Sequence, residues 1–133
     1  MAKETPELEI NPESICALIA RAHEFHGQDD VSFDEEPEGP ADVAATEMLS
    51  EYSEDPAYVS FKSVVEDLEP DQQVAVVALM WVGRGDFSAE EWDDALAQAR
   101  DAWTPHSADY LIATPLVADY LEEGLSQFGH ACD

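Results

Sequence analysis

Basic residues are scarce in this chain of 133 residues, which has 5 Lys and Arg against 31 Asp and Glu and a formal net charge of −26. Proteins bind nucleic acids and anionic membranes largely through Lys and Arg. The composition therefore argues against direct binding to either. The excess of carboxylates could attract a basic protein or mimic a nucleic-acid backbone, but the simpler interpretation of the charge is an acidic surface that maintains solubility.

Long apolar runs are also missing. The most apolar stretch, residues 74–82, is far shorter than the roughly 20 residues needed to span a bilayer. Residues 1–9 contain no apolar core of a signal peptide. These absences predict a protein without a membrane segment that is located in the cytoplasm.

Cysteine is rare too, with Cys16 and Cys132 at opposite ends of the chain. Their spacing matches neither a zinc site nor a disulfide framework. Cys16 lies on an apolar helix face, so we expect it to be a small core residue, and we expect Cys132 to be a free thiol.

Apolar residues make up 45% of the chain and recur mainly at helical spacing. The clearest element is a central helix at about 70–83, which begins with Pro70 and which Gly83 would end in a left-handed conformation. Its sequence has almost no polar group over residues 74–82. We expect the other helices to pack against it.

Helix-start signals divide the rest of the chain. Asn11-Pro12 and Asp55-Pro56 each combine a capping side chain with a proline in the first turn, and Ser88 with Glu91 forms a capping box before a helix over 89–103. No stretch of useful length alternates apolar and polar residues with period two, as a strand would. The prediction is an all-α, compact bundle of six or seven helices in a single domain over 11–133. A flexible lead at 1–10 precedes it, an acidic mobile loop lies at 28–40, a further helix covers 41–52, and the oligomeric state stays open.

Three stretches of the sequence resemble a family of small proteobacterial proteins catalogued as a domain of unknown function. The stretches are L-E-I-N-P-E near the start, the core V-A-L-M-W-V-G-R-G-D, and the ending T-P-L-V-A-D-Y-L-E-E-G-L-S-Q-F-G. The resemblance covers about residues 8–132 and implies a bacterial, cytoplasmic, single-domain protein. It transfers no catalytic residue.

Two sets of side chains are candidates for chemistry. His23 and His26 are three residues apart on a predicted helix, and imidazoles suit zinc or iron. However, no third ligand lies at a sequence spacing that is typical of a metal site. Two histidines near a helix C-terminus are also favoured by the helix dipole alone. A second set comprises Arg84, Trp81, His106 and Tyr110, which could line an aromatic pocket for an anion or could simply belong to the core.

No nucleotide-binding, hydrolase or calcium-loop motif is present, and no cofactor is implied. The sequence therefore favours a non-enzymatic acidic helical module that binds a basic protein. The alternative is a small-ligand-binding protein or small enzyme with a pocket near Arg84. Partner-binding candidates lie in the acidic loop, namely Asp34, Glu35, Glu36 and Glu38.

Overall fold

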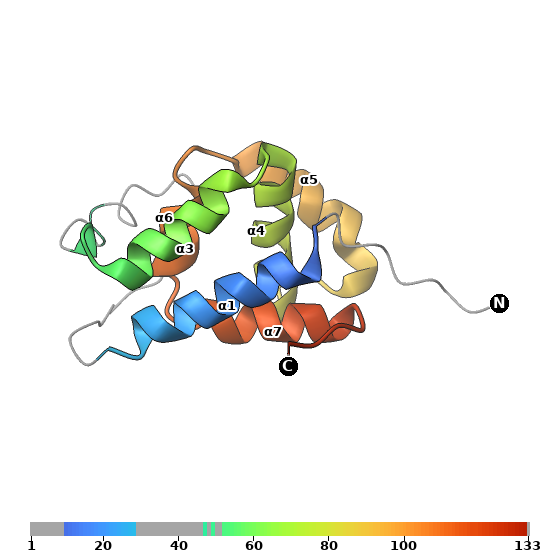
Figure 1. The fold of residues 1–133 in the computed structure, drawn as a ribbon. Coiled ribbons are helices and arrows are strands. Elements are labelled where there is room, and N and C mark those ends of the chain that lie inside the picture. Colours follow the sequence, from blue (N-terminus) through green and yellow to red (C-terminus); the bar gives the residue numbers. More distant parts are fainter. Residues whose placement is uncertain (1–9, 29–46, 48, 50–51, 133) are drawn as a thin grey trace.

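The computed structural model describes residues 10–28, 47, 49 and 52–132, and these residues form helices and connecting turns without a strand. The predicted all-α bundle is confirmed (Figure 1). Its elements are α1 (Pro12–His26), α3 (Pro56–Asp67), α4 (Pro70–Arg84), the 3₁₀ turn η2 (Ala89–Glu91), α5 (Trp92–Ala102), α6 (Ser107–Ala113) and α7 (Val117–Gln127).

The capping signals lie where the sequence placed them. The Asn11 side chain accepts a hydrogen bond from the Glu13 amide at 2.9 Å, and the Asp55 side chain accepts one from the Ala57 amide at 2.9 Å. Each bond satisfies an amide that the first turn of a helix leaves without a partner. The starts of α1 and α3 are therefore fixed by local chemistry.

The capping box at Ser88 is also present, since the Ser88 amide donates to the Glu91 carboxylate at 2.9 Å. The turn that it closes is the 3₁₀ turn η2, however, and α5 begins only at Trp92 rather than at residue 89. A tight 3₁₀ turn is common at a helix N-terminus. Of the aromatic residues beside the box, Phe87 stacks its ring on Trp81, and Trp92 meets Phe128 edge to face.

Helix α4 is the buried centre of the bundle, and every side chain over residues 73–82 is buried. It packs against α7 and α5 and, over a smaller area, against α6. The expectation that all helices pack on α4 is only partly correct. Helices α1 and α3 pack on each other, α1 packs on α7, and α3 packs on α6, so α7 is a second centre of packing (Figure 1).

The predicted end of the central helix at Gly83 is wrong. Helix α4 continues through Arg84, and the left-handed residue is Gly85, with φ of 100°. Gly83 lies inside the helix because α7 crosses there. A Cβ atom at Gly83 would overlap the carbonyl oxygen of Tyr120, so only glycine lets the two backbones approach this closely.

Gly124 makes the matching approach from α7. A Cβ atom there would lie 2.6 Å from the Leu79 carbonyl oxygen and 2.9 Å from the Leu79 side chain. The two glycines thus form one contact, in which α4 and α7 meet backbone against backbone.

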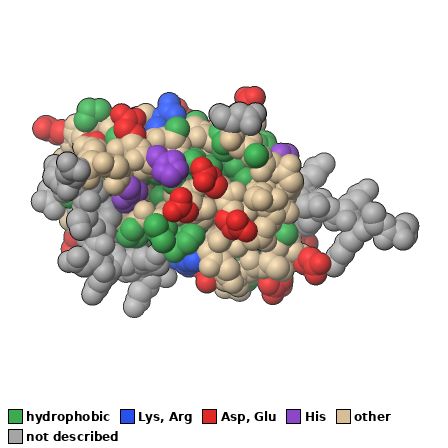
Figure 2. Space-filling model, turned by 90° about the horizontal axis from the view of Figure 1, so that it is seen from below, with side chains coloured by type: hydrophobic (Ala, Val, Ile, Leu, Met, Phe, Trp, Pro, Cys, Tyr) green, Lys and Arg blue, Asp and Glu red, His purple; other side chains and the backbone are tan. Residues whose placement is uncertain are grey.

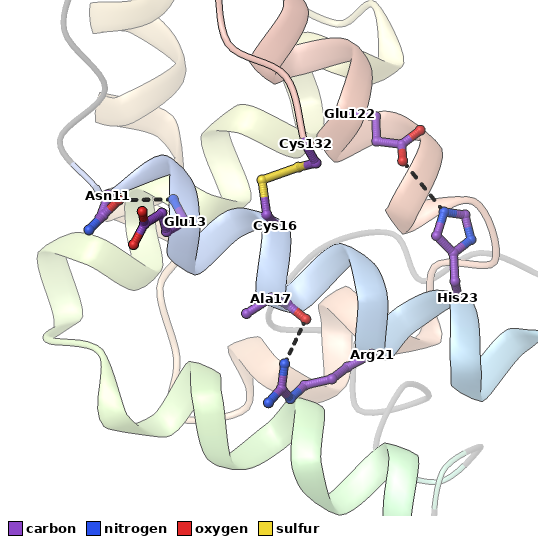
Figure 3. Close-up of a disulfide and its surroundings, with 8 residues drawn as sticks. All are labelled: Asn11, Glu13, Cys16, Ala17, Arg21, His23, Glu122 and Cys132. Carbon is purple, nitrogen blue, oxygen red and sulfur yellow. Dashed lines mark hydrogen bonds and ion pairs between the residues drawn. A yellow bond between two sulfur atoms is a disulfide. The ribbon is translucent and has the colours of Figure 1, made fainter.

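The two cysteines contradict the sequence prediction. Cys16 and Cys132 form a disulfide with a Cα–Cα distance of 5.6 Å, although they are 116 residues apart in the sequence (Figure 3). The prediction failed because pairing depends on where the chain ends meet. Helices α1 and α7 lie side by side, and the segment after α7 returns to the first half of α1.

Some predictions fall on residues that the structure does not describe. Most of the acidic loop at 28–40, most of the expected helix at 41–52 and most of the lead at 1–10 lie outside the described residues. At the edges of these segments, Ile10 and Leu49 are buried in the core.

Gly83→Ala should be severely destabilising, because the added methyl group meets backbone that cannot move without separating α4 from α7. We expect a loss of at least ~3 kcal/mol in the free energy of unfolding, measured by urea denaturation. Gly85→Ala is the matched control. Its added Cβ has no atom within 4 Å, so only the left-handed conformation is penalised, at about 1–2 kcal/mol. Equal losses in the two variants would contradict the close approach.

Replacing both cysteines with serine should lower the free energy of unfolding by about 2–5 kcal/mol, because the disulfide closes a loop of nearly the whole chain. A reducing agent should lower the stability of the wild-type protein by a similar amount and leave the double variant unchanged. Two titratable thiols in protein kept under oxidising conditions would show that the disulfide does not form.

Candidate functional sites

The residues around Arg84 form a cluster whose hydrogen bonds run to other residues of the same chain. Trp81 donates its indole N–H to the Tyr110 hydroxyl at 2.8 Å, and both partners are buried. Arg84 donates from Nε and Nη2 to Asp86 Oδ2, at 2.8 and 2.6 Å. The tight turn after α4 creates this pair, because the left-handed Gly85 folds Asp86 back on the end of the helix.

The charge of Arg84 is satisfied within the chain. Burial lowers the pKa of its guanidinium, but hydrogen bonds and charge interactions with Asp86 and Tyr110 outweigh burial, so the pKa is raised overall. The structure thus brings together Arg84, Trp81 and Tyr110. The fourth candidate, His106, is an exposed residue just before α6.

The two histidines of α1 have different surroundings. His26 Nε2 lies 2.8 Å from the Ile112 carbonyl oxygen, to which it donates as the N–H tautomer. Burial lowers the pKa of His26; the hydrogen bond to Ile112 raises it in part, and His23 lowers it further. His23 is exposed instead and lies 3.6 Å from Glu122 of α7 (Figure 3). The two rings are therefore oriented by different partners, His26 by Ile112 and His23 by Glu122.

A buried polar cluster that sequence analysis missed joins α3 to α6. The Tyr58 hydroxyl donates to Asp109 Oδ1 at 2.5 Å, and the Lys62 ammonium lies 3.5 Å from that hydroxyl and 4.0 Å from the carboxylate. Asp109 is only 3% exposed. The four-residue spacing of Tyr58 and Lys62 was visible in the sequence, but the carboxylate comes from a distant segment.

The surroundings of Tyr58 favour the protonated form of its hydroxyl. Burial of Tyr58, its hydrogen bond to Asp109 and the charges of Asp109 and Glu66 all raise the pKa of the phenol well above its ordinary value of 10.0. A phenol of this kind stays protonated at neutral pH and cannot serve as a base. Its role is to bridge α3 and α6 through a buried carboxylate.

The remaining carboxylates face solvent. Every Asp and Glu that the structure describes is exposed, except the buried Asp109 and the half-buried Asp55. Carboxylates are scattered over the face seen in Figure 2, with few Lys or Arg side chains among them. Three of the basic residues, by contrast, are half-buried and contact their own chain: Arg21, Lys62 and Arg84.

Comparison with known proteins assigns the chain to a family whose function is unknown. A family model described as "Protein of unknown function (DUF3775)" matches residues 59–130, which is more than half of the chain. The chain belongs to this family. No curated protein and no solved structure matches it.

The DUF3775 match contains α4 to α7 and most of α3. It therefore includes the Arg84 cluster, the two glycines of the α4–α7 contact and the carboxylates Asp109 and Glu122. Helix α1, with Cys16 and His23, lies outside it.

Among the described helices, none is both long and apolar enough to cross a membrane.

The lowered pKa of His26 predicts a pH dependence. As the pH falls through 6.5, the ordinary value, the unfolded chain binds a proton at this residue before the folded protein does. The wild-type protein should therefore lose stability relative to His26→Gln as the pH falls below 6.5, since glutamine keeps an N–H donor for Ile112 but does not titrate. Unfolding free energies measured across this range for both proteins test the prediction.

The exposed His130 near the C-terminus supplies the control. His130→Gln should parallel the wild-type protein over the same pH range. If His26→Gln also parallels it, the imidazole of His26 titrates alike in the folded and unfolded chains, and the prediction is wrong.

Proposed function

We propose that this protein is a non-enzymatic docking module that binds a basic protein through its exposed carboxylates. The observation that supports the proposal is the separation of charges. The described acidic side chains lie almost entirely on the surface, while Arg21, Lys62 and Arg84 are engaged by their own chain. An acidic surface with few balancing cations attracts basic partners and repels polyanions.

Acidic residues are dense in several segments of the chain. The predicted loop, with Asp34, Glu35, Glu36 and Glu38, lies outside the described residues. Two described segments each expose four carboxylates. The turn from α3 to α4 has Glu66, Asp67, Glu69 and Asp71, and the segment from η2 into α5 has Glu90, Glu91, Asp93 and Asp94. The loop remains our proposed contact, because no Lys or Arg lies between Arg21 and Lys62.

The pocket alternative has less support. A ligand-binding Arg84 needs donors directed at the ligand, but its Nε and Nη2 donate to Asp86. The Trp81 indole N–H is likewise directed at the Tyr110 hydroxyl, to which it donates. These contacts give the cluster a structural role at the end of α4, and they favour docking over small-molecule binding.

A bacterial origin and a location in the cytoplasm, both expected from the sequence, remain part of the proposal. Stable disulfides are rare in the cytosol, so a cytoplasmic location implies that the bond between Cys16 and Cys132 forms transiently there.

A charge-neutralised loop variant tests the docking proposal, with four substitutions: Asp34→Asn, Glu35→Gln, Glu36→Gln and Glu38→Gln. Tagged wild-type protein should retain a basic protein from a lysate at low salt and lose it at high salt. The loop variant should lose most of this binding at low salt. The purified partner then gives dissociation constants for both proteins.

A second variant with the same change in charge serves as control: Asp93→Asn, Asp94→Asn, Asp101→Asn and Glu123→Gln. It should bind nearly as well as the wild-type protein. If both variants bind equally weakly, the partner is held by general charge attraction, and the loop is not a specific contact. If no protein is retained, and Arg84→Lys abolishes a thermal shift produced by a small anionic metabolite, the pocket alternative replaces docking.

A further inference from the structure

Three potential metal ligands from two helices converge on the surface that α1 and α7 share. They are His23 of α1 and Asp119 and Glu122 of α7, and their ligand atoms all lie within 4.8 Å of one another. Asp119 and Glu122 are three residues apart and so lie on one face of α7. His23 faces them across the helix boundary, 3.6 Å from Glu122 (Figure 3).

We propose that His23, Asp119 and Glu122 bind a divalent transition-metal ion, with zinc as the best match. One imidazole with two carboxylates is a nitrogen and oxygen donor set of the kind that zinc accepts, and three protein ligands leave a coordination position for water. Calcium and magnesium prefer oxygen ligands alone, so the imidazole disfavours them. The proposal is independent of the docking function.

The site differs from the histidine pair that the sequence suggested. His26 does not join it, because its Nε2 donates to the Ile112 carbonyl. The missing ligands come from α7, about a hundred residues along the chain. Histidine and carboxylate side chains lie together on the face seen from below in Figure 2.

The backbone around the site is fixed, while its side chains are free to adjust. Helices α1 and α7 pack on each other, and the disulfide at Cys16, two turns before His23, ties α1 to the segment that follows α7. The side chains of His23 and Glu122 are 55% and 51% exposed. They can therefore move the short distance that coordination requires, and an ion can reach them from solvent.

The experiment uses untagged, chelator-treated protein with its disulfide intact, so that neither a tag nor a free thiol binds zinc. Zn²⁺ alone is titrated by calorimetry, and thermal unfolding is followed in parallel. We expect a single site and a rise in Tm of at least ~3 °C near saturation, since a ligand that binds only the folded state stabilises it. His23→Ala, and separately Asp119→Asn with Glu122→Gln, should weaken binding at least ~10-fold.

Matched controls change similar residues outside the site. His130→Ala removes another exposed histidine, and Asp101→Asn with Glu123→Gln removes two exposed carboxylates. Both should bind Zn²⁺ as the wild-type protein does. Equal binding by all variants would mean an adventitious ion only, held by the general acidity of the surface, and would overturn the proposal. Absence of any saturable binding to the wild-type protein would also overturn it.

Discussion

The contact between α4 and α7 is the constraint on which the rest of the fold depends. Gly83 and Gly124 remove the side chains that would otherwise separate the two helices, so that backbone meets backbone. This approach fixes α7 against the buried central helix, and α1 then packs on α7 and α3 on α1. The same geometry places the exposed face of α7, with Asp119 and Glu122, beside His23.

Polar groups inside the bundle and on its surface differ in whether they have partners within the chain. Inside, the buried polar side chains mostly have a partner. Some pair with one another, as Trp81 does with Tyr110 and Tyr58 with Asp109. Others donate to backbone carbonyls, as Gln73, Ser107 and Thr114 do. Such pairing is necessary because an unsatisfied buried group is costly. Outside, the described carboxylates accumulate with few balancing cations, of which Arg100 is one. The fold is therefore stabilised by its core, and the surface charge remains available for a basic partner or a cation.

Sequence reasoning predicted what local chemistry determines. The caps at Asn11 and Asp55, the capping box at Ser88 and the buried α4 follow from short patterns, and the structure contains them. It missed what depends on long-range contact. Gly83 looked like a helix end because its crowded surroundings come from α7, and Cys16 and Cys132 looked unrelated because their proximity depends on the whole fold. The ligands beside His23 were hidden for the same reason.

The most direct test of the central contact is a nuclear Overhauser measurement on isotope-labelled protein. The Gly83 Cβ position lies close to the Tyr120 carbonyl and 3.0 Å from the Gly124 amide nitrogen. If the two backbones meet here, the Gly83 α-protons should give strong cross-peaks to the amide proton of Gly124. If the cross-peak to Gly124 is missing and those α-protons contact α7 only through its side-chain protons, a layer of side chains separates the helices, and the close approach of the two backbones is contradicted.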